Sequence, residues 1–571
     1  MVTQKQMFTR KERKCFIESA LLTEIPRLLS KMDRCPTSAS SGCMDREYWA
    51  WATKDFSNAD MQRGVYVLSY LYKVEFPGNI YYQRSALLGW IILGIKFWIN
   101  KQDQQGSFDH LYINERSWMA TAFTLVDFLG IYKLIGAELL EPLKSDFFQA
   151  MERCANVLVQ RNEMHGFISN HRAAAAASLM ILANLCGNQK YQDRAWDLME
   201  SVYEHQSKEG WFQEYEGPDP GYQTLDTHYQ AIFYLETKSK KVLSAVSHSL
   251  DFLSYFLHPD GSIGGEYGSR SCPHFFPGGF EVFAEILPVA EALAQQGTIG
   301  LANGNSCGLA DSDDRNSIPL ATSYLLAHRS LCLNGDFDCT PLPWERNFER
   351  IWPEGGLYIR SDDKKYLIFG ASKGGVLKIY NKTNHELNYS NCGYVGVTSQ
   401  GKNCTTLLWK SKPDFYRDGL SGGAEMPLTN SSKVRLETPF FEFQTMRLMT
   451  PIKLILFRVF NLTIGKFRWI NDFVRKNLII KRFLTQRKVT SAMLIRELSF
   501  NAKGETLIED EIQTSPILKF RELQESGFFS TVYMASSKYF RKQDFIHAWR
   551  SEDISTKFNN YILKRSKTFI P

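Results

Sequence analysis

The chain has 571 residues, of which 44% are hydrophobic and 22% charged; these proportions are typical of a globular protein and exclude a disordered or coiled-coil chain. Its 67 Lys and Arg against 61 Asp and Glu give a net charge of +6, too small over this length to indicate binding of nucleic acid, and no nucleic-acid partner is expected. The length leaves room for about three domains and an enzyme active site.

The N-terminal segment and the cysteines bear on the compartment. Residues 1–33 lack the apolar stretch of a secretory signal, and the longest apolar run, 86–95, is too short to span a bilayer. The 11 cysteines are scattered singly, with no C-x-x-C pair and no zinc spacing. We therefore expect a cytoplasmic protein with reduced thiols, no metal and no cofactor.

Residues 1–44 are expected to form a lead-in, and 45–335 a helical domain. Within that domain apolar residues recur at helical spacing over long segments. These predicted helices span residues 87–100, 118–135, 147–160, 173–185, 191–205, 242–256 and 280–295.

A recurring loop punctuates these helices. Gly106, Gly166, Gly210 and Gly261 are each followed by an aromatic or aliphatic residue and then by a polar stretch that leads into the next helix. Glycine suits the position just after a helix end, where the chain turns through the left-handed region. A unit that repeats about every fifty residues predicts stacked helical hairpins, and about five or six of them predict a closed (α/α) toroid.

Beyond residue 335 the pattern changes to short strands. β-rich runs at 357–360, 366–369, 376–380, 405–409 and 507–512 alternate with turn signals such as Glu354-Gly-Gly and Ser372-Lys-Gly-Gly. Many short strands at this spacing predict an antiparallel β-sandwich over 336–571.

One segment of the second domain is unusual. Residues 465–488 contain eight Lys and Arg and a single acid, Asp472, among apolar residues that include Phe467 and Trp469. This pattern predicts a basic amphipathic helix. Its apolar face either packs on its own domain or lies on an anionic membrane, which would place the protein peripheral to the inner face of that membrane.

Loops at equivalent places in successive hairpins of a toroid converge on one rim, so their side chains are candidates for one site. The first loop carries Asp109, His110, Tyr112, Asn114, Glu115 and Arg116; the second carries Asn170, His171 and Arg172, with Ser169 as the expected N-cap. The third, 214–229, carries Asp219, Gly221, Tyr222, Asp226, His228 and Tyr229; the fourth, 264–281, carries Glu266, Tyr267, Ser269, Arg270, His274 and Glu281. A polar cleft with aromatic walls suits a carbohydrate.

Each candidate also has a purely structural interpretation. Glu115 and Arg116 can form an ion pair within their loop, and His171 can be a hydrogen-bonded core histidine. Tyr222 can simply pack beneath its Pro-Gly turn, and Glu266 can hold Arg270 in place. The cluster is more informative than any single member.

Two motifs resemble those of the heparinase II/III-like polysaccharide lyases, whose fold is an (α/α) toroid followed by an antiparallel β-sandwich. Ser169-Asn-His-Arg-Ala-Ala-Ala resembles the family's Asn-His segment, which faces the substrate uronate. Glu216-Gly-Pro-Asp-Pro-Gly-Tyr resembles the Glu-Gly to Gly-Tyr stretch, whose tyrosine is catalytic. The resemblance implies an acidic, uronate-containing polysaccharide as substrate and no cofactor.

The resemblance also implies the chemistry, which is removal of the C5 proton of a uronic acid followed by β-elimination of the 4-linked glycan. Asn170, His171 and Arg116 would hold and neutralise the carboxylate, and Tyr222 would act as base or acid. The substrate-binding residues expected from the polar loops are Glu115, Tyr112, His228, Tyr229, Glu266, Tyr267 and Arg270, and the comparison with the family adds His385. His385 is a stand-in, because the family's β-domain histidine motif is missing here.

Three alternatives remain open from the sequence. Return of the proton to C5 from the opposite face would make the protein a uronate C5-epimerase in polysaccharide biosynthesis. A chain that kept the toroid and lost turnover would be a non-catalytic glycan-binding protein. A glycosidase would need a carboxylate pair, such as Glu115 with Asp226 or Glu266, at the right separation.

Overall fold

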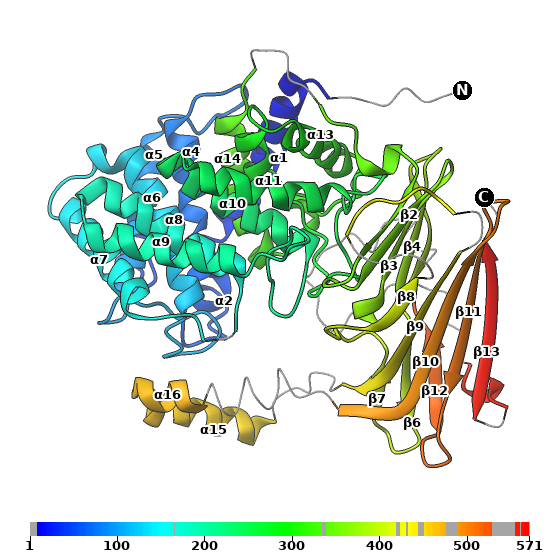
Figure 1. Cartoon of the computed structure of the whole chain (residues 1–571). Helices are drawn as coiled ribbons and strands as arrows, with labels where there is room; N and C mark the ends of the chain where they lie inside the picture. Colours follow the sequence, from blue (N-terminus) through cyan, green and yellow to red (C-terminus); the bar gives the residue numbers. More distant parts are fainter. Residues whose placement is uncertain are drawn as a thin grey trace.

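The computed structural model describes residues 8–164, 166–333, 339–417, 423–429, 432–443, 450–474, 488–527, 554–559 and 561–569. A helical domain and two β-sheets lie beside each other (Figure 1). The helices of the first domain are α1 (Arg10–Ser30), α2 (Arg46–Trp49), α3 (Ala59–Gln62), α4 (Gly64–Lys73), α5 (Ser85–Lys101), α6 (Trp118–Ile135), α7 (Leu143–Gln160), α8 (Ser169–Cys186), α9 (Gln189–Glu204), α10 (Pro220–Thr237), α11 (Lys240–Ser254), α12 (Gly278–Phe283), α13 (Pro288–Ala302) and α14 (Asp314–Ser330).

Alternate helices form a closed inner ring. Each of α4, α6, α8, α10, α12 and α14 packs against the next, and α14 packs back against α4. The inner helices are buried over most of their length; α8 buries the alanines at 173–177, whose small side chains let neighbouring helices approach closely. The predicted (α/α) toroid is confirmed.

The first helix completes the outer layer of this ring. The sequence analysis set residues 1–44 apart from the toroid, but α1 packs against α13 and α14. The buried guanidinium of Arg13 lies 3.0 Å from Glu281 of α12 and 2.7 Å from Glu291 of α13, and Arg10 reaches Glu291 at 2.8 Å. A buried, ion-paired cation thus fastens the start of the chain to helices about 270 residues away.

Helix boundaries follow the local sequence signals. The predicted helix at 118–135 coincides with α6. The single helix predicted at 280–295 is wrong: the structure has α12 and α13, separated before Pro288 because proline suits a first helical turn and disfavours helix in the residue before it.

The repeated glycines share one turn geometry. Gly106, Gly210 and Gly261 have φ of +102°, +102° and +80°, and each donates its N–H to the carbonyl three residues earlier. The prediction that these glycines directly follow a helix end is wrong. Each of them instead closes a tight turn a few residues beyond the helix. A Cβ at Gly106 would lie 2.3 Å from the carbonyl oxygen of Arg153 on α7, so the turn needs glycine both for its φ and for this close approach.

One stretch of the described residues, Trp118–Glu138, is long and apolar enough to cross a membrane. It is 72% buried within the protein, as expected for a central helix of the ring.

The second domain contains two antiparallel sheets that pack face to face. The first has the order β1 (Phe348–Trp352), β2 (Leu357–Ser361), β3 (Lys365–Gly370), β4 (Val376–Asn381), β5 (Glu386–Asn391). The second has the order β12 (Phe520–Glu525), β6 (Tyr394–Thr398), β7 (Asn403–Thr405), β9 (Ser432–Glu442), β10 (Lys488–Phe500), β11 (Thr506–Gln513), β13 (Ile562–Phe569), and β8 (Asp414–Arg417) pairs with β9.

The predicted β-sandwich is confirmed. Leu367 and Phe369 of the first sheet pack against Leu436 and Leu498 of the second in one apolar cluster. The strand predicted at 405–409 is wrong in extent, because β7 ends at Thr405. Beyond it Trp409 instead packs on Gly217 of the toroid, where a Cβ would have no room.

A helical insert leaves the second sheet between β9 and β10. It contains α15 (Pro451–Leu462), the 3-10 turn Ile464–Lys466 and α16 (Arg468–Val474), and it lies apart from both sheets, beneath the toroid (Figure 1). The helix predicted at 465–488 therefore begins as a 3-10 turn and a short helix, and its part at 475–487 lies outside the described residues.

Candidate active site

The second and third loops are joined at one rim of the toroid, where α8 and α10 begin. Ile168 and Glu214 form an antiparallel bridge, and the N–H of Ser169 donates to the carbonyl of Gln213. The predicted N-cap role of Ser169 is wrong, because its hydroxyl also donates to Gln213, at 2.8 Å, and Ile168 occupies the cap position. The joined loops bring the first turns of the two helices together.

Asn170 is held by a buried carboxyl group. Its backbone N–H donates to Glu214 Oε1 at 3.0 Å, and its Nδ2 donates to Oε2 at 2.7 Å. Burial raises the pKa of Glu214 well above its usual value, with the negative charge of Asp226 adding to the effect. The Oδ1 of Asn170 is buried without a hydrogen-bond partner, which is costly unless another molecule supplies one.

His171 is oriented by a second carboxylate. Its Nδ1 lies 3.1 Å from Glu163 Oε2, and its ring meets the edge of Phe123 at 5.4 Å between centroids. The described residues offer no hydrogen-bond partner to Nε2. A histidine held in this way presents one ring nitrogen for proton transfer.

Tyr222 lies in the first turn of α10. Asp219 caps this helix by accepting from the N–H of Tyr222 at 3.0 Å, and Pro220 occupies the first helical position. Burial raises the pKa of Tyr222 well above its usual value; Tyr215 and Cys272 add to the rise and the positive charge of Arg270 opposes it. Tyr222 is therefore a neutral phenol at neutral pH.

Two arginines beside these residues have no anionic partner among the residues that the structure describes. The guanidinium of Arg270 stacks over Tyr215 at 4.0 Å, and that of Arg172 over Phe167 at 4.7 Å. The Nε of each is buried without a hydrogen-bond partner, and no carboxylate of the described residues pairs with either. Unpaired, partly buried guanidinium groups are suited to bind carboxylate or sulfate groups of a ligand.

The β-sandwich fixes the fourth loop from the other side. Lys378 of β4 forms a buried ion pair with Glu266, and Lys373 donates to the carbonyl of Ser269 at 3.1 Å. Tyr267 is fully buried, with its hydroxyl 2.7 Å from His258 Nε2. Glu266 thus joins the two domains, Tyr267 belongs to the interior, and Arg270 is the predicted binding residue of this loop that stays partly exposed.

Side chains of the first loop are engaged within the protein. Arg116 pairs with Asp103 at 3.0 Å and donates to the carbonyl of Lys466 in the insert, while Glu115 accepts from the backbone of His110 at 3.0 Å. The ring of Tyr112 meets Phe457 of α15 at 5.4 Å. These predicted site residues order their loop and attach it to α15 and to the 3-10 turn Ile464–Lys466.

Asp226, His228 and Tyr229, which were predicted to lie in the third loop, are buried residues of helix α10. The sequence analysis treated 214–229 as a loop, but α10 begins at Pro220 because Asp219 provides its cap. Tyr229 is fully buried, stacks on Phe123 and accepts from Arg63 at 3.1 Å, and His228 is buried beside it. Asp226 is also buried and accepts from Gln230 at 2.5 Å; because Glu115 and Glu266 are buried too, these carboxyl groups do not form an exposed glycosidase pair.

His385 lies elsewhere. It occupies the turn between β4 and β5 with φ of +56°, and its ring meets Trp344 at 5.1 Å. Trp344 lies in the segment that leads into β1, outside the four rim loops. The structure does not bring His385 to Tyr222.

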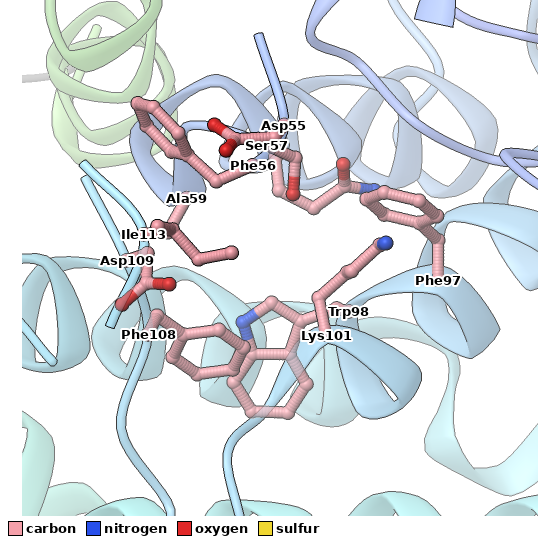
Figure 2. Close-up of a pocket in the computed structure, with 11 residues that line it drawn as sticks. Asp55, Phe56, Ser57, Ala59, Phe97, Trp98, Lys101, Phe108, Asp109 and Ile113 are labelled. Carbon is pink, nitrogen blue, oxygen red and sulfur yellow. The ribbon is translucent and has the colours of Figure 1, made fainter. Parts of the chain in front are cut away.

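A small cavity of about 180 Å³ lies behind the first loop. Figure 2 shows its lining, which includes Trp98 and Lys101 of α5, Phe108 and Asp109 of the first loop, and Asp55. It is smaller than the roughly 300–1,000 Å³ of a ligand pocket. Among the described residues no group of three or more His, Cys, Asp and Glu side chains could hold a metal ion.

Sequence reasoning missed Glu163, Glu214 and Lys378. Glu214 begins the third polar stretch, but only the fold brings it to Asn170, 44 positions earlier. Glu163 precedes His171 by 8 positions, across a turn whose geometry no motif encodes. Lys378 sits within a strand pattern that reads as a core strand, and nothing in that pattern points to a partner in another domain.

Residues 59–278 match the family model of the ulvan lyase N-terminal domain. No curated protein matches the chain. The matched region covers the inner helices from α4 to α10 and all four polar loops except the end of the last.

Solved polysaccharide lyases share the fold of the whole chain. Xanthan lyase of Paenibacillus aligns with a TM-score of 0.51 and 9% identity over 92% of this chain and 48% of its own. Chondroitin AC lyase of Streptomyces coelicolor A3, solved with chondroitin sulphate, gives 0.52 and 8% over 90% and 67%. Heparinase III gives 0.50 and 10% over 91% and 73%. The chain spans about half the length of the xanthan lyase, and the resemblance to polysaccharide lyases with a heparinase-like fold is confirmed.

Proposed function

Proceeding from a toroid that matches the ulvan lyase N-terminal domain, we propose that this protein is a polysaccharide lyase that cleaves a uronate-containing glycan by β-elimination. One observation carries the proposal: the joined starts of α8 and α10 collect Asn170, His171 and Tyr222 beside two unpaired guanidinium groups. Acid, base and anion-binding groups together are what removal of a proton next to a carboxylate requires.

The substrate carboxylate would be bound by Arg270 or Arg172, with Asn170 as a further donor. A half-turn of the Asn170 amide exchanges its nitrogen and oxygen. The raised pKa of Glu214 favours its neutral form, whose O–H could then donate to Asn170 Oδ1. Nδ2 would turn toward the substrate, and the charge that develops on the carboxylate would meet a donor already in place.

Proton transfer is assigned to His171 and Tyr222. Nε2 of His171 removes the C5 proton while Glu163 stabilises the resulting imidazolium. The electron pair of the C5–H bond forms the C4–C5 double bond, the C4–O4 bond breaks, and the hydroxyl of Tyr222 protonates the departing O4. The raised pKa of Tyr222 keeps it protonated for this step.

Purified protein mixed with a panel of uronate-containing polysaccharides in deuterated water is expected to produce ultraviolet absorbance from the unsaturated uronate at the new chain ends. Mass spectrometry of the products should find one unsaturated residue for each bond broken. Heat-inactivated protein is the control.

Two other results would replace the lyase assignment. Deuterium at C5 without absorbance would identify a C5-epimerase, since the first proton transfer is common to both reactions. Binding to a glycan with neither signal would identify a glycan-binding protein.

Replacing Arg270 with Gln is expected to lower kcat/KM by roughly 10- to 100-fold, because a charged hydrogen bond contributes about 1.5–3 kcal/mol. The loss should shrink on the methyl ester of the same polysaccharide, because the ester keeps the C5 proton acidic but carries no charge for Arg270 to bind. Lys241→Gln, which removes an exposed cation paired with Glu200 on the outer layer, is the matched control. An equal loss on both substrates would mean that Arg270 only supports its loop.

A further inference from the structure

The insert between β9 and β10 has an inverted pattern of burial. In its described part, residues 450–474, the buried side chains are the polar Asn461 and Asn471, whereas Leu456 is 63% and Trp469 73% exposed. We call the exposed apolar set the α15–α16 surface; it consists of Ile452, Leu454, Ile455, Leu456, Val459, Leu462, Ile464, Phe467, Trp469 and Phe473. A helix of a globular protein normally buries such residues, and a contiguous exposed group of them marks an interaction site.

Polar contacts hold the insert in this orientation. Asn114 of the first loop donates to the carbonyl of Asn461 at 2.9 Å, and Asn471 donates back to the carbonyl of Asn114 at 2.8 Å. Arg458 pairs with Asp55 at 3.1 Å. Because these anchors attach the polar side of the insert to the toroid, the apolar side faces outward.

The charge of the segment narrows the choice of partner. Residues 451–488 contain ten Lys and Arg and one acid, Asp472, and Lys453 and Lys466 are exposed within the described part. A second copy of the chain would bring two basic surfaces together, which is unfavourable. An acidic polysaccharide would match the charge but leave the isoleucines and leucines in water. An anionic bilayer satisfies both properties, because head groups attract the basic residues and acyl chains accept the apolar ones.

We propose that the α15–α16 surface docks this protein on an anionic lipid bilayer. Trp469 and Phe473 sit at the level of the head groups, where aromatic side chains are favoured in membranes. The insert is attached to the first loop, so docking brings the rim that carries Tyr222 toward the bilayer. The proposal does not depend on the lyase activity.

The test is co-sedimentation of the full chain with vesicles of phosphatidylglycerol and phosphatidylcholine in equal parts. Binding is expected, with little binding to phosphatidylcholine alone and weakening as salt rises. The variant Ile455→Ser, Leu456→Ser, Trp469→Ser should partition about tenfold less or weaker still, since three inserted side chains are lost. The matched control replaces Ile80, Leu140 and Ile517, which are equally exposed elsewhere, with Ser and should bind like the parent.

Circular dichroism and thermal melting establish that both variants are folded. Absence of binding to anionic vesicles, or equal loss in the control variant, would overturn the proposal. The proposal would also be overturned if sedimentation equilibrium showed a dimer of the parent and a monomer of the Ile455, Leu456 and Trp469 variant. A second copy of the chain would then cover the surface.

Discussion

Tyr222→Phe is expected to lower kcat by about 10²–10⁴, the range for loss of a positioned acid or base. The change removes one hydroxyl and leaves the ring at the start of α10, so KM and thermal stability should change little. Because burial raises the pKa of Tyr222, its phenol stays protonated up to at least about pH 10. Deprotonation of this residue should therefore not lower the activity below that pH.

Tyr234→Phe is the matched control for this variant. Tyr234 lies on the same helix, three turns further along, and is buried against Phe283. It should retain nearly full activity. If Tyr222→Phe kept more than about a tenth of the parental kcat, its hydroxyl would not be the proton donor.

Arg13→Leu is expected to lower the free energy of unfolding by about 3–5 kcal/mol, the usual cost of removing one partner of a buried ion pair. Glu281 is fully buried and would lose its cation, although Glu291 keeps Arg10. Since α1 would lose its link to α12 and α13, hydrogen exchange should rise first in α1. Denaturant unfolding monitored by circular dichroism measures the change.

The stability lost in Arg13→Leu should be smaller at low pH than at neutral pH. Burial already raises the pKa of Glu281 in the parent, and loss of Arg13 raises it further. Below that pKa the carboxyl is neutral, so the cost of the variant should shrink as the pH falls. Lys11→Leu, an exposed cation on the same helix, should change stability by less than about 0.5 kcal/mol. An equal effect of the two variants would contradict the role assigned to Arg13.

The architecture could be predicted where local periodicity decides it. Residues 118–135 form a helix as expected, because almost every position is apolar and Ser117 caps it. A proline marks both the break before Pro288 and the start of α10 at Pro220. The apolar spacing across the first nevertheless predicts one continuous helix, and the polar residues after the second predict a loop.

The candidate site was predictable only in part. Asn170 and His171 begin α8 and Tyr222 lies in the first turn of α10, but the partners Glu214 and Glu163 depend on pairing between loops that no local signal encodes. Tyr229 and Tyr267 belong to the interior because their hydroxyls pair with Arg63 and His258, contacts that span 166 and 9 positions. A tyrosine of the core and a tyrosine of a site look alike in sequence.

Because of the ion pair between Lys378 and Glu266, the helical ring depends on the β-sandwich. The fourth loop contains Glu266 and Arg270, and its buried carboxylate is neutralised by a strand that is made more than 100 residues later. A ribosome that has released only the helical ring has therefore made a loop with an uncompensated charge. The fourth loop therefore reaches its final charge balance only after the sandwich has been synthesised and has docked, and the proposed lyase activity would begin only then.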